Sequence, residues 1–413
     1  MRKNIALLSD NGEMLLEEIN ELDIPQDDLG ASLEQLEQME DALDDAGATV
    51  ETVDTLTTVL QNTEEVSPVA LESLMRAHTY LVNRIGFSTE SYRYTSKDIA
   101  LESFMDSAKN IYESIIKVFK KAVDWVVDFF KQLFNRAERL KNTAKKLKQM
   151  ATDNADKKLS DTLISQMEFS KLLCFKGQLI NGDQLYPALN KLFEAMDGIE
   201  KQYLNQEKIT RIANNFEKIV DQSDPEKRKD AMMAMRHVFL DMPKFKKSPN
   251  QTGVKDGWVL GEEVLPFGNK SLFTKMPKEF SDSDMNIGFS IQLSDSSETH
   301  TVPSALAHIP FKEVRDIESV AELVEKYLGS FYEKDKVVKE LGKVLSKAIS
   351  FSKINVTNTG GKDFTRTQLF MVLTMIRKVF INFYAELKNY NVSICQAALQ
   401  FCKANLMNMT SKT

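Results

Sequence analysis

The chain has 413 residues, of which 42% are hydrophobic, and a formal net charge of −7 at pH 7. This apolar fraction is ordinary for a globular protein and excludes a wholly disordered or fibrous chain. Three cysteines and four scattered histidines favour neither a disulfide framework nor a metal site, and no apolar run reaches the roughly 20 residues that a membrane span needs.

The charge is divided unevenly along the chain. Residues 1–102 contain 22 acidic and 6 basic side chains, a formal charge of −16, whereas residues 103–413 carry +9. Such asymmetry is typical of an acidic tail, or of a chain with a nucleic-acid or membrane partner. Two interpretations stay open: a solvated acidic tail, and a removable segment that neutralises a basic body until it is cut off. We call residues 1–102 the acidic segment.

The predicted elements begin inside the acidic segment. Residues 1–67 are polar, acidic and poor in aromatic side chains, a composition that favours disorder or loosely packed helices. A short helix is expected over 68–86, because Pro68 stands near its start.

Residues 104–150 carry the clearest helical pattern of the chain. Apolar side chains recur at three- and four-residue steps from Phe104 to Leu133, and the opposite face is rich in lysine. A helix with such a face must bury it, most commonly against other helices of its own domain; lying in a membrane interface is the alternative. The basic face could also contact phosphate without regard to sequence. The residues expected to contact phosphate or membrane are Lys117, Lys120, Lys121, Trp125, Lys131, Arg136 and Arg139.

The rest of the chain is predicted to be helical apart from one interval. Helices are expected over 159–173, 185–204 and 209–220, from Pro225 to Phe239, and over 317–330, 333–354, 363–388 and 391–408. Crowded glycines and prolines in 243–312 predict a small β insertion, at about 250–300, with strands at 258–260, 271–273 and 287–293.

The expected fold class is therefore mainly α, with a small β insertion in a helical body. We expect four regions: an acidic, partly disordered or helical propeptide at 1–102, a helical region at 103–242, the β-containing insertion at 243–312, and a C-terminal helical region at 313–413 that packs with 103–242.

No motif of a known catalytic chemistry is present. The chain has no phosphate-binding GxxxxGK[ST] loop, GxGxxG, HExxH, CxxC or GxSxG. We therefore expect no enzyme, no cofactor and no metal site.

The border of the acidic segment carries a repeated motif. Ala-Leu-Glu-Ser occurs at 70–73 and again at 100–103, and Ser-Thr-Glu-Ser at 88–91 has the same small-x-Glu-Ser form. Ala, Leu and Glu are strong helix formers, so chance similarity at helix starts is the alternative explanation. Three copies within 34 residues, ending where the charge changes sign, are more specific than one.

This junction resembles a known family. Small-x-Glu followed by a cut is the recognition pattern of prohead maturation proteases in large tailed bacteriophages. With its acidic front and a basic helical part that opens SFMDSAKNIYESIIKVFKKAV, the chain is similar to the internal head proteins of such phages. The resemblance implies a terminal cut between Glu102 and Ser103, with Glu72 and Glu90 as earlier or alternative cuts.

The resemblance also implies partners and a location. They are the prohead protease, packaged DNA bound non-specifically, and capsid or other internal head proteins, inside the virion after synthesis in the host cytoplasm. The alternatives are an effector that is ejected and binds and inhibits a host defence protein, and a protein that acts on a membrane during genome delivery.

Overall fold

The structure is a computed structural model. It describes residues 55–84, 97–164, 170–203, 206–221, 224–240, 245–251, 256–277, 290–296, 308–331 and 383–410, with Val254 and a few single residues before residue 54. The helix predicted over 333–354 lies outside the described residues, as does most of the one predicted over 363–388.

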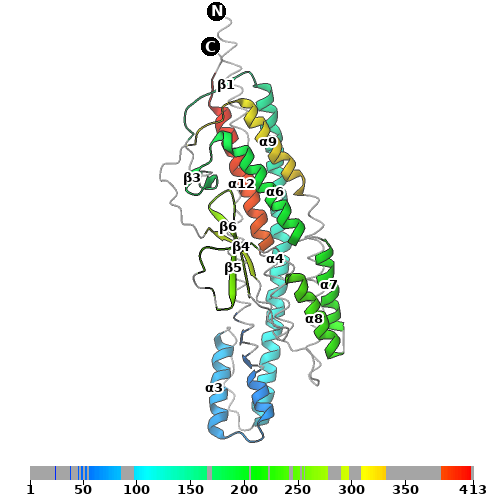
Figure 1. The fold of residues 1–413 in the computed structure, drawn as a ribbon. Helices are drawn as coiled ribbons and strands as arrows, with labels where there is room; N and C mark the ends of the chain where they lie inside the picture. The colour runs from blue at the N-terminus through cyan, green and yellow to red at the C-terminus, as the bar shows by residue number, and fades with distance from the viewer. Residues whose placement is uncertain are drawn as a thin grey trace, which may run out of the picture.

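One long helix, α4 (Lys97–Asp153), runs through the molecule (Figure 1). Its 57 residues include neither glycine nor proline, and at 1.5 Å per residue they span about 85 Å. The predicted helix over 104–150 is confirmed and extended at both ends. Its N-terminal end packs against α3 (Pro68–Arg84), and the C-terminal half enters the main core.

Three further helices form a bundle with the C-terminal half of α4: α6 (Gly182–Tyr203), α9 (Val314–Gly329) and α12 (Phe383–Met407). α9 and α12 contact α4 and one another, and α6 packs on α9 (Figure 1). Buried side chains occur on every side of α12, which is typical of a central core helix. These four helices therefore hold most of the hydrophobic core.

The helices α7 (Gln206–Asp221) and α8 (Pro225–Leu240) pack on each other beside this bundle. Pro225 is the first residue of α8, where the missing N–H costs no helical hydrogen bond. Both helices were predicted, and their apolar faces at Ile212, Phe216 and Met235 are buried in the main core.

The predicted β insertion is present as a four-stranded antiparallel sheet in the order β4-β5-β6-β7. The strands are β4 (Lys246–Lys247), β5 (Trp258–Val264), β6 (Lys270–Pro277) and β7 (Ser290–Asp295). Gly261 permits close packing within this sheet, because a Cβ at that position would lie only 2.5 Å from the Thr274 hydroxyl oxygen. β7 contacts α12, which places the sheet against the helical body (Figure 1).

The helix predicted over 159–173 is wrong at its start, because Leu159 lies in a strand and residues 160–164 are not helical, whereas residues 165–169 lie outside the described residues. β1 (Lys158–Leu159) pairs with β8 (Met409–Thr410), and Ile164 forms an isolated bridge with His308. β2 (Cys174–Phe175) and β3 (Gln178–Leu179) form a hairpin whose two turn residues both have positive φ, as its tight turn requires. Of the apolar residues that suggested a helix, Leu159 and Ile164 instead pair with distant parts of the chain.

The break predicted between residues 388 and 391 is also wrong, because α12 continues from Phe383 to Met407. Asn389 and Asn391, at this position, are poor helix formers. In the fold, the Asn389 side-chain oxygen accepts a hydrogen bond from Arg136, and Asn391 is buried, so tertiary packing outweighs local preference.

Candidate functional site

The repeated motif lies near the start of two helices. Ser67 precedes α3, and its hydroxyl accepts a hydrogen bond from the Ala70 amide. Glu72 is exposed and forms an ion pair of 2.7 Å with Arg76, one turn further along α3. Glu102 is exposed on α4, and the peptide bond that follows it lies inside this continuous helix. Glu90 and the Ser103 side chain lie outside the described residues.

The side chains on either side of the Glu102 bond are buried. Ala100 and Phe104 are both 0% exposed, although neither belongs to the main core. The imidazole of His78, from α3, stacks on the Phe104 ring with 4.3 Å between ring centroids and 15° between planes. Lys97, the first residue of α4, donates a hydrogen bond to the Thr63 carbonyl. α3 and Thr63 are therefore docked on α4 at the predicted cut, while Ile24 and Val53 of the acidic segment belong to the main core.

His78 itself is an unusual residue for this position. It is fully buried, and neither ring nitrogen has a hydrogen-bond partner among the described residues. Burial lowers the pKa of the imidazole from 6.5 to about 4, because the charged form would lose its hydration. The stacked arrangement consequently needs the neutral ring.

The predicted contact residues on α4 divide into two groups. Lys117, Lys120 and Lys121 are exposed. Arg139 is exposed as well, and Lys131 is exposed and paired with Asp128 at 2.9 Å.

Two of the predicted contact residues face the core instead. Arg136 is buried and donates hydrogen bonds to Asn389 and Gln396 of α12, which removes it from the predicted contact surface. Trp125 is partly buried, packs against the main core and stacks on Phe129. The sequence pattern did not reveal that Arg136 is buried. Helical spacing alone does not distinguish a basic residue that faces the core from one at the edge of the solvent-exposed face.

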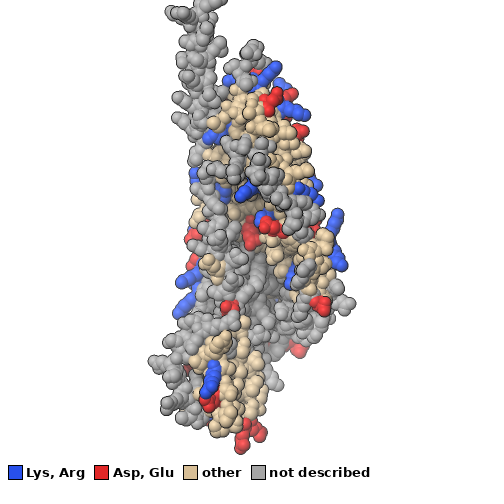
Figure 2. All heavy atoms as spheres, turned by 90° about the vertical axis from the view of Figure 1, so that its left-hand side faces the viewer, with Lys and Arg blue, Asp and Glu red and all other residues tan. Residues whose placement is uncertain are grey.

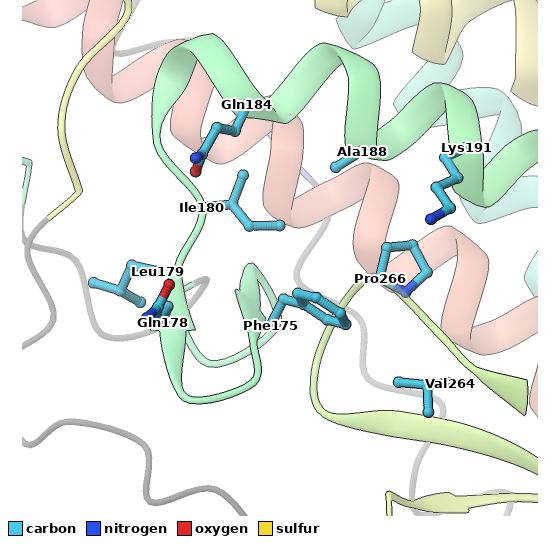
Figure 3. Close-up of a pocket in the computed structure, with 9 residues that line it drawn as sticks. All are labelled: Phe175, Gln178, Leu179, Ile180, Gln184, Ala188, Lys191, Val264 and Pro266. Atoms are coloured by element: carbon cyan, nitrogen blue, oxygen red, sulfur yellow. The ribbon is translucent and has the colours of Figure 1, made fainter.

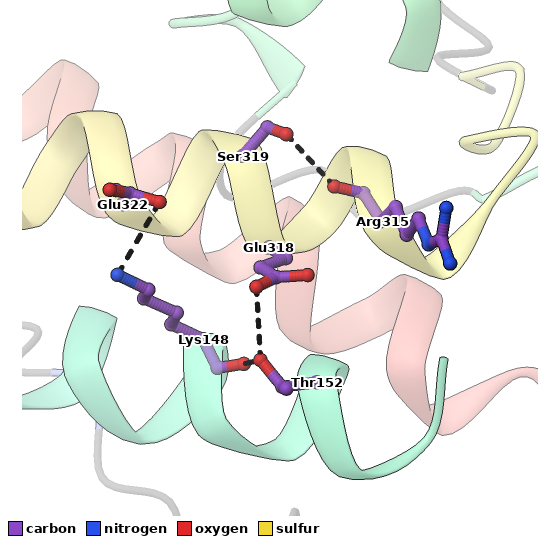
Figure 4. A network of polar contacts seen from close by, with 6 residues as sticks. All are labelled: Lys148, Thr152, Arg315, Glu318, Ser319 and Glu322. Carbon is purple, nitrogen blue, oxygen red and sulfur yellow. Dashed lines mark hydrogen bonds and ion pairs between the residues drawn. The ribbon is translucent and has the colours of Figure 1, made fainter. Parts of the chain in front are cut away.

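Charges are dispersed over the body. On the face shown in Figure 2, Lys and Arg side chains lie along the outer edges of the described surface with Asp and Glu among them. One lysine of α4 contacts α9: Lys148 pairs with Glu322 at 3.4 Å, and the Thr152 hydroxyl, one turn further along α4, donates a hydrogen bond to Glu318 (Figure 4). Any anion contact would therefore involve separate cations rather than one basic patch on this face.

A buried Ser–His pair was not predicted. Because a carbonyl only accepts, the His308 Nδ1 donates to the Ile180 oxygen at 2.8 Å, and Nε2 accepts from the Ser170 hydroxyl at 3.0 Å. Burial lowers the pKa of His308, which keeps the ring neutral in this role. Both side chains are 0% exposed, so this hydroxyl has no path to a substrate and instead joins two chain segments.

A second unpredicted feature is an ion pair inside the bundle. Lys388 of α12 and Glu200 of α6 form a hydrogen-bonded pair, and both are buried. The Lys388 ammonium also lies 4.4 Å from the centre of the Phe331 ring. Charged residues on predicted core helices are a weak sequence signal, since only the fold shows which ones meet.

An open pocket of about 300 Å³ lies between the β2–β3 hairpin, α6 and the sheet (Figure 3). Phe175, Ile180, Ala188 and Pro266 give it an apolar lining, and Gln184 and Lys191 border it. It contains no pair of titratable groups placed for acid–base chemistry.

Neither a metal cluster nor a membrane span is found in the part of the chain that the structure describes. Within the described ranges, no three His, Cys, Asp or Glu side chains are grouped to hold a metal ion. None of the helices that the structure describes combines the length and apolarity needed to cross a bilayer.

A family model for phiKZ-like phage internal head proteins matches residues 17–404. The chain belongs to this family. The match covers most of the acidic segment as well as the helical body, so the two halves are parts of one internal head protein. It also places the protein inside the phage capsid, in agreement with the resemblance at the junction. The comparisons with curated proteins and with solved structures gave no match.

Proposed function

We propose that this internal head protein is made as a precursor and that the prohead protease removes the acidic segment by cutting between Glu102 and Ser103. The observation that carries this proposal is the coincidence of three features at one bond: the third small-x-Glu motif, the change of charge from −16 to +9, and the exposed glutamate. Cuts after Glu72 and Glu90 precede or accompany the terminal one.

The test is the N-terminal residue of the protein isolated from purified particles, read by mass spectrometry of its terminal peptide. We expect Ser103. An intact chain that begins at Met1 would overturn the proposal. Glu102→Gln is the matched variant: it keeps the size and helix preference of the side chain, and it should leave longer forms in the particle.

We further propose that the processed body is packaged with the DNA and lies among capsid or other internal head proteins, without enzymatic activity. Removal of the acidic segment leaves a product of +9, and each cation that neutralises a phosphate releases a counterion. Lys117, Lys120 and Lys121 are exposed on one stretch of α4 and suit this role.

DNA binding by the processed protein should therefore weaken with salt. Replacing the three lysines by glutamine should reduce the slope of log affinity against log salt by about 3, if each contacts one phosphate. Lys270→Gln is the control, because Lys270 is already paired with Asp295 at 2.6 Å. This substitution should leave the slope unchanged. An unchanged slope in the triple variant would remove α4 from the DNA contact.

Of the alternatives, membrane action has the least support. The aromatic side chains that would enter a bilayer are engaged elsewhere: Phe129 and Phe130 are buried in the main core, and Trp125 packs against it. Ejection into the host, followed by binding of a host protein, remains a prediction that rests on the family resemblance. Recovery of a specific host protein with the processed chain would support it.

A further inference from the structure

The first two motif copies stand near the two ends of α3, and α3 packs against the start of α4, where the third copy lies. Cuts after Glu72 and Glu90 would excise residues 73–90, the piece that contains His78 and most of α3.

The bond after Glu102 is closed to a protease as long as this docking persists. Proteases bind their substrates as extended strands, so residues on both sides of the bond must leave the helix. Here the bond lies within α4, and unwinding it would expose Ala100 and Phe104, which are both fully buried. The bond after Glu72 also lies in a helix, but Ala70 and Ser73 beside it are exposed, so unwinding α3 there uncovers less apolar surface. Exposure of the Glu102 side chain alone therefore does not make the bond accessible.

α3 holds these residues without belonging to the main core. The His78 ring lies flat on Phe104, and none of His78, Ala100 and Phe104 is part of the large hydrophobic cluster. α3 could thus leave without unfolding the body, as a local opening of the structure. While α3 is covalently joined to α4, its high effective concentration favours redocking. Once α3 is excised, it is a short free helix of marginal stability.

We propose that α3 is a clamp on the terminal cutting site and that the cuts occur in a fixed order, with the Glu102 bond last. The inference rests on the proposed processing. Cuts after Glu72 and Glu90 release the clamp, Phe104 loses its stacking partner, and the first turns of α4 open to the protease. Each cut is a hydrolysis that consumes one water and leaves a carboxylate on the glutamate and an amino group on the next residue. The repetition of the motif then has a role: the upstream copies make the last one accessible.

The test follows the appearance of the three cuts when the full precursor is incubated with the prohead protease of the same phage. In the wild-type chain, fragments that end at Glu72 and Glu90 should appear before any chain that begins at Ser103. The Glu72→Gln/Glu90→Gln variant blocks the upstream cuts, and it should slow the cut after Glu102 by about tenfold or more. Adding His78→Ala to that variant should restore the rate, because the clamp is then weakened without a cut.

Tyr80→Ala is the matched control for the rescue, since Tyr80 lies on the same helix but is 68% exposed. It should not restore the Glu102 cut. Circular dichroism of each variant checks that the helical body is retained.

The outcomes separate this inference from the function on which it rests. Wild-type cutting at Glu102 in the Glu72→Gln/Glu90→Gln variant would overturn the clamp and leave the proposed processing intact. Slow cutting that His78→Ala does not rescue would also overturn it. A protease that cuts none of the three sites would overturn the proposed processing, and the clamp with it.

Discussion

The docking of α3 on α4 should weaken in mild acid because of His78. The imidazole is fully buried against Phe104, neither nitrogen has a partner among the described residues, and its pKa falls from 6.5 to about 4. Undocking returns the ring to water and to its ordinary pKa. Between these two values the undocked state binds more protons than the docked state, so docking is complete above pH 6.5 and is progressively lost as the pH falls.

The magnitude follows from the interval between the two pKa values. At about 1.36 kcal/mol for each tenfold change in proton affinity, the interval from 6.5 to about 4 corresponds to a loss of about 3 kcal/mol. At pH 5 the loss is about 2 kcal/mol, enough to change the docked-to-undocked ratio by roughly 30-fold.

The assay is hydrogen exchange of the amides of α3, followed by mass spectrometry and corrected for the intrinsic effect of pH. Protection of residues 68–84 should fall between pH 7.5 and pH 5 in the wild-type precursor. In His78→Phe, whose ring stacks but cannot be protonated, protection should be independent of pH over this range. An equal pH dependence in the two proteins would refute the assignment to His78, as would a titration of His78 near pH 6.5 in the intact precursor.

Three further predictions concern the body. Lys388→Met alone should destabilise the fold by about 3–5 kcal/mol in urea unfolding, because it leaves Glu200 buried without its partner, whereas Lys388→Met with Glu200→Leu should recover most of that loss; equal instability of the single and double variants would contradict this. Gly182→Ala should lower the thermal midpoint by several degrees, because a Cβ there would lie 2.6 Å from the Phe311 backbone; Gly198→Ala, with open space around it, is the control. A thiol reagent should modify none of the cysteines in the folded protein and all of them in guanidinium, since burial raises the pKa of each thiol; rapid labelling of the native protein would contradict this for Cys174, Cys395 and Cys402.

The sequence was sufficient for elements whose pattern is long and uninterrupted. α4 has apolar side chains at helical spacing and lacks helix breakers, so its prediction needed no tertiary information. Three strands of the sheet, β5, β6 and β7, were located by the glycines and prolines around them, whereas the two-residue β4 was not predicted. The region around Ile164 failed because short bridges owe their existence to partners far along the chain, such as His308. α12 was also divided in error, in a stretch where Asn389 accepts a hydrogen bond from Arg136 of the distant α4.

The cut proposed after Glu102 was predicted from the sequence, but the burial of the residues around that bond was not. The repeated motif points to Glu102 by residue type and spacing alone. Whether the neighbouring side chains are free or covered depends on His78, a lone histidine in an acidic segment, which no spacing rule links to Phe104. The same limit applies to Arg136, whose burial depends on a helix about 250 residues away.

The continuity of α4 across the predicted cut has a consequence for the new chain end. In the full chain the first turn of α4 carries Asp98, a negative charge that complements the positive end of the helix dipole. A cut after Glu102 would remove Asp98 and leave a protonated amino group on Ser103, where a positive charge is unfavourable. The shortened helix should fray at this end, and the severed halves would have little tendency to re-form the original turn. Processing would therefore oppose its own reversal, because Asp98 leaves with the removed segment and the new amino group is unfavourable at the helix start.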